Sequence, residues 1–271
     1  MSTLPHLTPV ETEFLLLHVS GVNTLPDSTA RLEPRGRPDG EPVMHQRWDD
    51  LLFLHWPLDP PALRPFIPTA LDIDTFEGQA WIGITPFRVE DIRLGSLPAI
   101  PGLNSFNEVN VRTYVIHDGV PGLWFFSLDA SMLAATVAAR VFFRLPYFLA
   151  DIDFKQQTQQ FEFNSDRIGP PGAKLRASWR TGNRLRDPDS ESLAFFLVER
   201  YCYFAVENGN VYQTRIYHHP WILEEADVQE FSTTLPGAVG LPMPSSKPLT
   251  YFSRALPVDI WTPQVVGVRE S

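Results

Sequence analysis

Apolar and polar positions alternate along much of the chain from Gln79 onward, and the apolar ones are rich in aromatic and β-branched residues. This pattern is typical of half-buried β-strands. It predicts strands over these ranges: Ala80–Val89, Phe106–His117, Leu123–Asp129, Phe148–Phe163 in two pieces, Lys174–Thr181, Tyr201–Val206 and Val211–His218. Asp118-Gly119 and Asn208-Gly209 lie between consecutive runs and are dipeptides typical of tight hairpins. We therefore expect antiparallel pairing.

Two longer segments have a helical pattern instead. Ser131–Arg144 is rich in alanine, ends before Pro146, and has its own first residue or Asp129 as the expected N-cap. Ser190–Arg200 is similar and is expected to begin with its serine as the cap. These helices are few and short compared with the predicted strands.

Many strands with a few helices predict a mainly β domain, a closed or nearly closed β-barrel that encloses a pocket. A third, short helix is predicted over Glu224–Phe231, and the 26 prolines disfavour long helices. Residues 1–42 are expected to form an N-terminal arm or linker, because Asn23–Pro42 contains almost no large apolar residue. Residues 43–271 are expected to form one domain.

Composition and charge exclude several classes of partner. With 44% hydrophobic residues the chain can bury a sizeable core, and its net charge of -10 disfavours nucleic acid and anionic lipid surfaces. The best N-terminal apolar run, Phe14–Val19, is too short for a signal peptide, and no stretch reaches the roughly 20 apolar residues of a membrane span. The single Cys202 excludes an internal disulfide. We expect a cytoplasmic protein with a small-molecule ligand and no membrane partner; homo-oligomerisation is left open.

The segment Phe106–Val115 carries the most informative polar pattern. On a strand, alternate residues face opposite sides. One face then holds only polar or phenolic groups, namely Glu108, Asn110, Arg112 and Tyr114, while the other holds Val109, Val111, Thr113 and Val115. The polar face either meets bulk water or lines a polar lumen, and the sequence leaves both open.

Arg140 stands among the alanine, valine and phenylalanine residues of the predicted helix Ser131–Arg144. We expect this helix to be buried, and a buried guanidinium needs an anion, either a carboxylate such as Glu108 or a bound ligand. A structural ion pair, or a side chain that extends to the surface, is the alternative interpretation.

A series of motifs resembles the YqjF-like family of uncharacterised bacterial proteins. The resemblance runs from about Val43 to Pro263 and so covers most of the chain. Its motifs are Gln46-Arg47-Trp48, Leu52–Trp56, Leu63-Arg64-Pro65 with Ile67-Pro68, Gly78–Trp81, Pro86-Phe87, Phe106–Tyr114, Ala139-Arg140, Leu145–Phe148, Glu199-Arg200-Tyr201 and His219-Pro220-Trp221. Because the family is uncharacterised, the resemblance implies no particular reaction.

More remotely, the YqjF-like family resembles the acetoacetate decarboxylase-like fold, which implies a β-barrel around a ligand cavity. The decarboxylases form a Schiff base through a lysine in a Pro-Lys-Lys stretch. Here Tyr147 follows Pro146 and takes the position of that lysine, and Glu108 corresponds to a glutamate of the decarboxylase pocket. The three lysines of the chain lie elsewhere, at Lys155, Lys174 and Lys247. The resemblance therefore implies the cavity but puts the Schiff-base chemistry in doubt, with Lys155 left as a displaced alternative nucleophile.

The candidate catalytic residues are Glu108, Arg140 and Tyr147. Arg140 would grip a carboxylate, Tyr147 would donate to a carbonyl oxygen, and Glu108 would act as general base or acid. The candidate ligand-binding residues are Asn110, Arg112 and His55, although a histidine within an apolar run is also typical of a packed core.

Two functions fit these residues. The first is a Schiff-base-independent lyase or isomerase that acts on a small carbonyl or carboxylate compound. The second is a non-catalytic ligand-binding protein, a sensor or carrier that has lost the lysine. No cofactor is expected, since the chain has no dinucleotide or phosphate-loop motif, and no metal is expected, since His218 and His219 would point to opposite faces of a strand.

Overall fold

The computed structural model describes residues 25–243 and 245–268, and expectations for residues 1–24 lie outside this range. Within it, thirteen strands form one sheet in the order β13-β10-β9-β5-β6-β7-β8-β11-β12-β1-β3-β4-β2. The strands are β1 Met44–Leu58, β2 Asp72–Ile73, β3 Ala80–Leu94, β4 Phe106–His117, β5 Val120–Ala130, β6 Tyr147–Gln157, β7 Gln160–Arg167, β8 Lys174–Arg184, β9 Cys202–Glu207, β10 Asn210–His218, β11 Glu224–Thr233, β12 Leu249–Ile260 and β13 Gln264–Val268. The mainly β class is confirmed.

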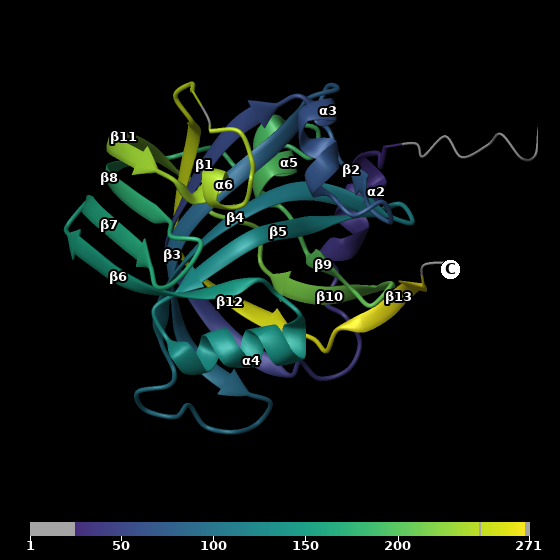
Figure 1. Cartoon of the computed structure of the whole chain (residues 1–271), viewed down its shortest axis with the longest axis horizontal. Helices are drawn as coiled ribbons and strands as arrows, with labels where there is room; N and C mark the ends of the chain where they lie inside the picture. The colour runs from purple at the N-terminus through teal and green to yellow at the C-terminus, as the bar shows by residue number, and fades with distance from the viewer. Residues whose placement is uncertain (1–24, 244, 269–271) are drawn as a thin grey trace, which may run out of the picture.

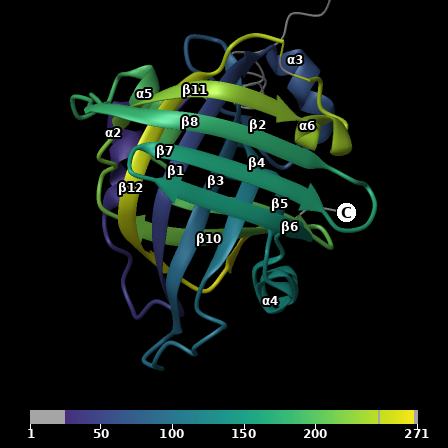
Figure 2. The same cartoon turned by 90° about the vertical axis from the view of Figure 1, so that its left-hand side faces the viewer.

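Two further pairings, β4–β5 and β10–β12, close the sheet on itself (Figures 1 and 2). The first closes a ring that runs from β5 through β6, β7, β8, β11, β12, β1 and β3 to β4. The second closes a ring that runs from β10 through β9, β5, β4, β3 and β1 to β12. Most neighbours are antiparallel, as expected, but β5 pairs with β6 and with β9 in parallel. Both rings share five strands, namely β1, β3, β4, β5 and β12. One face of each shared strand is therefore directed to the interior of the first ring, and the other face to the interior of the second.

Two hydrophobic clusters fill this interior. One contains the stacked rings of Phe161 and Trp179, whose centroids lie 5.2 Å apart, and Phe252. The other contains Phe53, Phe87, Leu128 and their neighbours. The two clusters explain why β1 was not among the predicted strands: its run Leu51–Trp56 is buried on both faces, so apolar residues do not alternate with polar ones.

The predicted hairpins are confirmed. Strand β4 spans the predicted residues, and the β4–β5 turn has left-handed backbone at Asp118 (φ 49°) and Gly119 (φ 78°). The β9–β10 turn has the same pattern at Asn208 (φ 51°) and Gly209 (φ 79°). Successive positive φ angles match the right-handed twist of the flanking strands, which is why these dipeptides select tight hairpins.

Two predicted helices are present with other caps. Helix α4, Leu133–Phe143, ends at Arg144 in a left-handed conformation (φ 55°). Neither expected cap serves it, because Ser131 Oγ accepts from the backbone N–H of Asn107 and Asp129 pairs with Arg167. Helix α5, Leu193–Val198, is shorter than predicted. Its cap is Ser192, whose hydroxyl accepts from Phe195 N–H at 3.2 Å.

The predicted third helix is wrong, because Glu224–Phe231 lies in strand β11. Glutamate, alanine and glutamine favour helix locally, but β11 pairs along its length with β8. Its residues alternate between more and less exposed positions, with Ala226 and Val228 on the packed side. Pairing with a neighbouring strand outweighs a helix propensity of a few tenths of a kcal/mol per residue.

The segment that precedes β1 packs on the rings. Helix α2, Ser28–Leu32, is capped by Asp27, and the 3-10 turn Glu33–Arg35 follows it. Arg215 donates to the carbonyl oxygen of Pro34 at 2.8 Å. This part of the expected arm is therefore in contact with the sheet, while the domain boundary at Val43 stays a prediction.

Short elements complete the fold. They are α3 Pro60–Leu63, a 3-10 turn at Arg64–Phe66, and α6 Leu235–Ala238. Among the described residues no helix combines the length and apolar character needed to cross a membrane.

Candidate functional site

A cavity of about 650 Å³ lies in the second ring, walled by residues of β1, β3, β4, β5, β9, β10 and β12, together with Tyr147 of β6 and one side of α4. Most of its wall is apolar. The polar and charged groups that line it include Glu108, Asn110 and Arg112 from β4, Tyr147 from β6, and Arg200. The polar face of β4 thus lines a lumen and does not meet bulk water, which decides between the two interpretations of its sequence pattern.

Glu108 and Tyr147 form a buried hydrogen-bonded pair at the cavity wall. The Tyr147 hydroxyl donates to Glu108 Oε2 at 2.6 Å, and Asn110 Nδ2 donates to Oε1 at 3.3 Å. Burial raises the pKa of Glu108 to about 7, although the two hydrogen bonds oppose this shift. Burial, and then the neighbouring carboxylate, raise the pKa of Tyr147 well above its usual value. Glu108 can therefore exchange a proton near neutral pH, while Tyr147 keeps its own.

Arg112 supplies a buried cation to the same cavity. Its residue is 6% exposed, its Nε has no hydrogen-bond partner, and no carboxylate of the described chain lies within 4.0 Å of its guanidinium. Its Cζ lies 5.4 Å from the centre of the Phe53 ring. Gly83 leaves room for it, because a Cβ there would lie 3.3 Å from Arg112 Cγ. Burial lowers the pKa of Arg112, so an anionic ligand would satisfy it.

His55 lies behind the cavity wall and does not line it. Its side chain is fully buried between Phe53 and Tyr114, with ring centres 6.2 and 6.3 Å away, and neither ring nitrogen has a hydrogen-bond partner. Burial first, and the charge of Arg112 second, lower the pKa of His55 well below its usual value. A neutral ring packed among aromatic rings fits the core interpretation of this histidine.

Arg140 is exposed, contrary to the expectation of a buried guanidinium. Its Nε donates to the carbonyl oxygen of Tyr147 at 2.6 Å, and it lines a separate surface groove together with Arg144. The expectation failed because α4 packs one side only and leaves Val137 and Phe142 exposed. The structure therefore brings Glu108 and Tyr147 together but leaves Arg140 outside their cavity.

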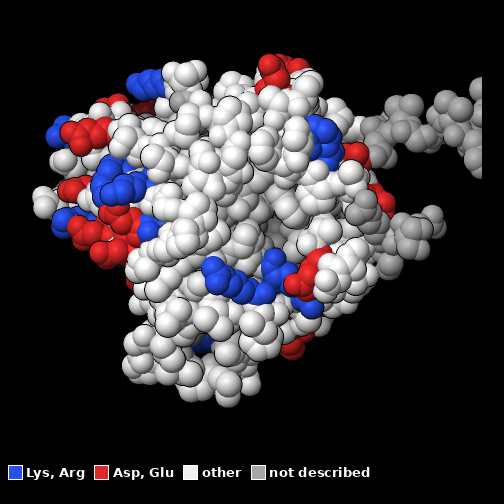
Figure 3. All heavy atoms as spheres, in the orientation of Figure 1, with Lys and Arg blue, Asp and Glu red and all other residues white. Residues whose placement is uncertain are grey.

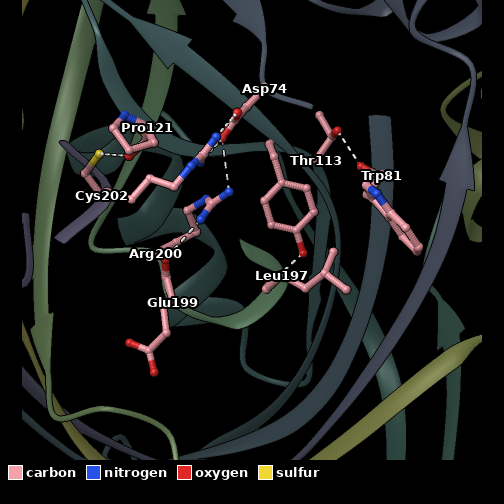
Figure 4. Close-up of polar contacts among 10 residues, drawn as sticks. Asp74, Trp81, Thr113, Pro121, Leu197, Glu199, Arg200 and Cys202 are labelled. Carbon is pink, nitrogen blue, oxygen red and sulfur yellow. Dashed lines mark hydrogen bonds and ion pairs between the residues drawn. The ribbon is translucent and has the colours of Figure 1, made fainter. Parts of the chain in front are cut away.

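A second buried arginine, not among the candidates, reaches the cavity at Arg200. It pairs with Asp74 at 3.1 Å (Figure 4). Arg31 also donates to both Asp74 oxygens, at 2.6 Å. Burial lowers the pKa of Arg200 to about 10. Its neighbour Glu199 accepts from the Trp221 backbone N–H at 2.9 Å. The motif Glu199-Arg200-Tyr201, two charges directly after an apolar helix, was the available sequence signal.

No lysine contributes to the described cavity wall. All three lysines are exposed. Lys155, the alternative nucleophile, pairs with Asp153 at 2.5 Å on the outer surface. In the part of the chain that the structure describes, no group of three or more histidine, cysteine or acidic side chains could hold a metal ion.

Residues 45–257 match the family model DUF2071, described as an uncharacterized conserved protein. The chain belongs to the DUF2071 family. It is 39% identical over 224 residues to the uncharacterized protein YqjF of Bacillus subtilis (strain 168), a match that covers 83% of this chain and 93% of that protein. The predicted resemblance to the YqjF-like family is confirmed.

Solved structures place this DUF2071 protein near the acetoacetate decarboxylase-like fold. The enduracididine biosynthesis enzyme MppR complexed with pyruvate has a TM-score of 0.59 at 13% identity and covers 84% of this chain and 92% of its own. Acetoacetate decarboxylase from Legionella pneumophila has a TM-score of 0.55 at 13% identity and covers 92% and 98%. At such identities the likeness shows the fold alone.

Proposed function

We propose that this DUF2071 protein is a Schiff-base-independent lyase or isomerase that transfers a proton next to the carbonyl group of a small-molecule substrate. The observation that carries the proposal is the buried Glu108–Tyr147 pair, in which a carboxyl group with a pKa of about 7 faces a cavity. A general acid or base works best when its pKa is near the working pH. The fold relatives that include enzymes, such as MppR, are consistent with this role.

In this proposal the Glu108 carboxylate takes a proton from a carbon next to the substrate carbonyl. The Tyr147 hydroxyl, which donates to Glu108 in the free protein, then donates to the resulting enolate oxygen instead. Because the two groups are 2.6 Å apart, one substrate can contact both. Asn110 holds the carboxylate, and Arg112 binds an anionic group deeper in the cavity. Return of the proton to another carbon would complete an isomerisation.

Deuterium exchange tests this chemistry. The protein is incubated in deuterated buffer with 4-oxopentanoate, 4-oxodecanoate or 2-octanone, and exchange next to the carbonyl is followed by NMR. We expect exchange above the enzyme-free rate, a drop of about 10²–10⁴-fold in Glu108→Gln, and a drop of about 10²–10³-fold in Tyr147→Phe. Asp151→Asn, an exposed acid on β6, is the matched control and should keep the rate. Equal exchange in Glu108→Gln and the parent protein would refute the proposal.

A non-catalytic ligand-binding protein is the second candidate, and the largely apolar cavity wall favours it. Its signature is a ligand that raises the melting temperature of the parent protein and of Glu108→Gln equally, with no exchange in either. Location in the cytoplasm, absence of a nucleic-acid partner and self-association stay predictions.

A further inference from the structure

The cavity differs in character between its opening and its interior. Most of the lining residues that are also exposed are apolar, and they mark the opening; they include Leu97 (61%) and Ile100 (57%) in the loop before β4, and Phe142 (66%) on α4. The loop and α4 lie at the same end of the molecule (Figures 1 and 2). No charged residue occurs between Leu94 and Asn107, and Figure 3 shows the projecting loop almost wholly without charge. The opening therefore favours an apolar group.

The charged end of the cavity is deep. Strand β4 begins with Phe106 next to this loop, and Arg112 follows six residues later on the same face. At about 3.4 Å per residue, Arg112 Cα lies about 20 Å along the strand from Phe106 and about 14 Å from Glu108. A ligand anion held by Arg112 therefore lies further along the strand than the groups that Glu108 and Tyr147 contact.

Size supports the same conclusion. A cavity of about 650 Å³ lies inside the range of about 300–1,000 Å³ that holds drug-sized ligands. The buried Arg112 guanidinium interacts with the neutral Tyr114 hydroxyl, but its Nε has no partner and no carboxylate of the described residues forms an ion pair with it, so a ligand anion would complete its surroundings. A ligand with a carboxylate at one end of an apolar chain fits the apolar opening, the buried Arg112 guanidinium and the size of the cavity.

We infer that the ligand is an amphipathic monocarboxylate of medium or long chain, with its carboxylate at Arg112, its body past Glu108 and Tyr147, and its tail at the opening. This inference rests on the proposed function for the role of the cavity and names the ligand class of that same site. A substrate of this class carries its carbonyl in mid-chain, opposite Glu108, rather than beside the carboxylate.

A homologous series of ligands tests the class. Calorimetric titration of the full chain with butanoate, hexanoate, octanoate and decanoate should show affinity rising about fourfold per methylene, the fold-change that corresponds to about 0.8 kcal/mol. The variant Leu97→Ser with Ile100→Ser changes two exposed side chains at the opening. It should weaken decanoate several-fold and leave butanoate unchanged. Affinity that is flat or falls with chain length, or equal weakening of both acids, would overturn the inference.

The carboxylate end is tested separately. The variant Arg112→Met should bind decanoate no more tightly than 1-decanol. It should still bind 1-decanol, and this binding shows that the variant is folded. Arg180→Met, an exposed arginine on β8, is the matched control and should keep the preference for decanoate over 1-decanol. Equal affinity of the parent protein for the acid and the alcohol contradicts the assignment.

Failure of this inference and failure of the proposed function give different results. If acid affinity rises with chain length and depends on Arg112, but no oxo compound exchanges a proton, only the proposed chemistry is refuted. Exchange on 2-octanone that depends on Glu108, with no chain-length dependence of acid binding, refutes only the ligand class.

Discussion

The phenolic oxygen of Tyr147 lies 2.6 Å from Glu108 Oε2, and this contact joins two strands that are not neighbours in the sheet. Strand β5 lies between them, pairing Ala130 with Glu108 in antiparallel register and Leu128 with Tyr147 in parallel register. The closure of the rings at β5 therefore sets the distance between the carboxyl and the phenol. The pair is a product of topology and not of sequence proximity, since 39 positions separate its members.

Glu108 should make stability depend on pH. Its folded pKa of about 7 is raised above the ordinary 4.5, so its contribution is full below about pH 4.5 and is lost as the pH rises through 7. Denaturant unfolding at several pH values should show the parent protein losing about 3 kcal/mol of unfolding free energy relative to Glu108→Gln as the pH rises across this window. Asp151→Asn should show no such change. A constant difference for Glu108→Gln would mean that the carboxyl is ionised throughout.

Tyr147→Phe should raise the pKa of Glu108 further, because the hydroxyl donates to the carboxylate and favours its charged form. Infrared difference spectra of the carboxyl band during a pH titration measure this shift. The variant should also lose about 1–3 kcal/mol of stability at pH 8.5, where Glu108 is ionised, and less at pH 5.5. A loss that is the same at both values contradicts the predicted coupling.

Asp74→Asn should be strongly destabilising. The Asp74 carboxylate is fully buried between Arg31 and Arg200, and its loss leaves the Arg200 guanidinium buried without an anion. We expect a cost of about 3–5 kcal/mol by urea unfolding. Asp153→Asn, which breaks the exposed pair with Lys155, should change stability little. Similar midpoints for both variants would show that Arg200 finds another partner.

Gly122→Ala should destabilise the β5–β9 contact. A Cβ there would lie 2.6 Å from Phe204 Cε2 and 2.9 Å from Cys202 Sγ, both in the packed core. Overpacking of this kind costs about 1–3 kcal/mol. Gly172→Ala is the matched control, because no atom lies within 4 Å of its added Cβ and its φ is not positive. Thermal unfolding of the two variants compares them directly.

Structural features that depend on the preferences of a few adjacent residues were predictable from the sequence. The dipeptides Asp118-Gly119 and Asn208-Gly209 select their hairpins because they accept positive φ, and alternation on Phe106–His117 predicted a strand with one polar face. The choice between water and lumen for that face could not be made, because it depends on which strands close the ring. The exposure of Arg140 could not be predicted either, because an apolar helix at a surface and a buried helix have similar sequences.

The sequence by itself determined the mainly β class, the family, the turns, and the presence of Glu108, Tyr147 and Arg112, because strand alternation and turn preference act over a few residues. Only the tertiary structure decided that Glu108 meets Tyr147, that Arg200 joins the cavity, and that Glu224–Phe231 is a strand. These outcomes depend on pairing between distant strands, and the desolvation that raises the pKa of Glu108 exists only once both rings have closed around it.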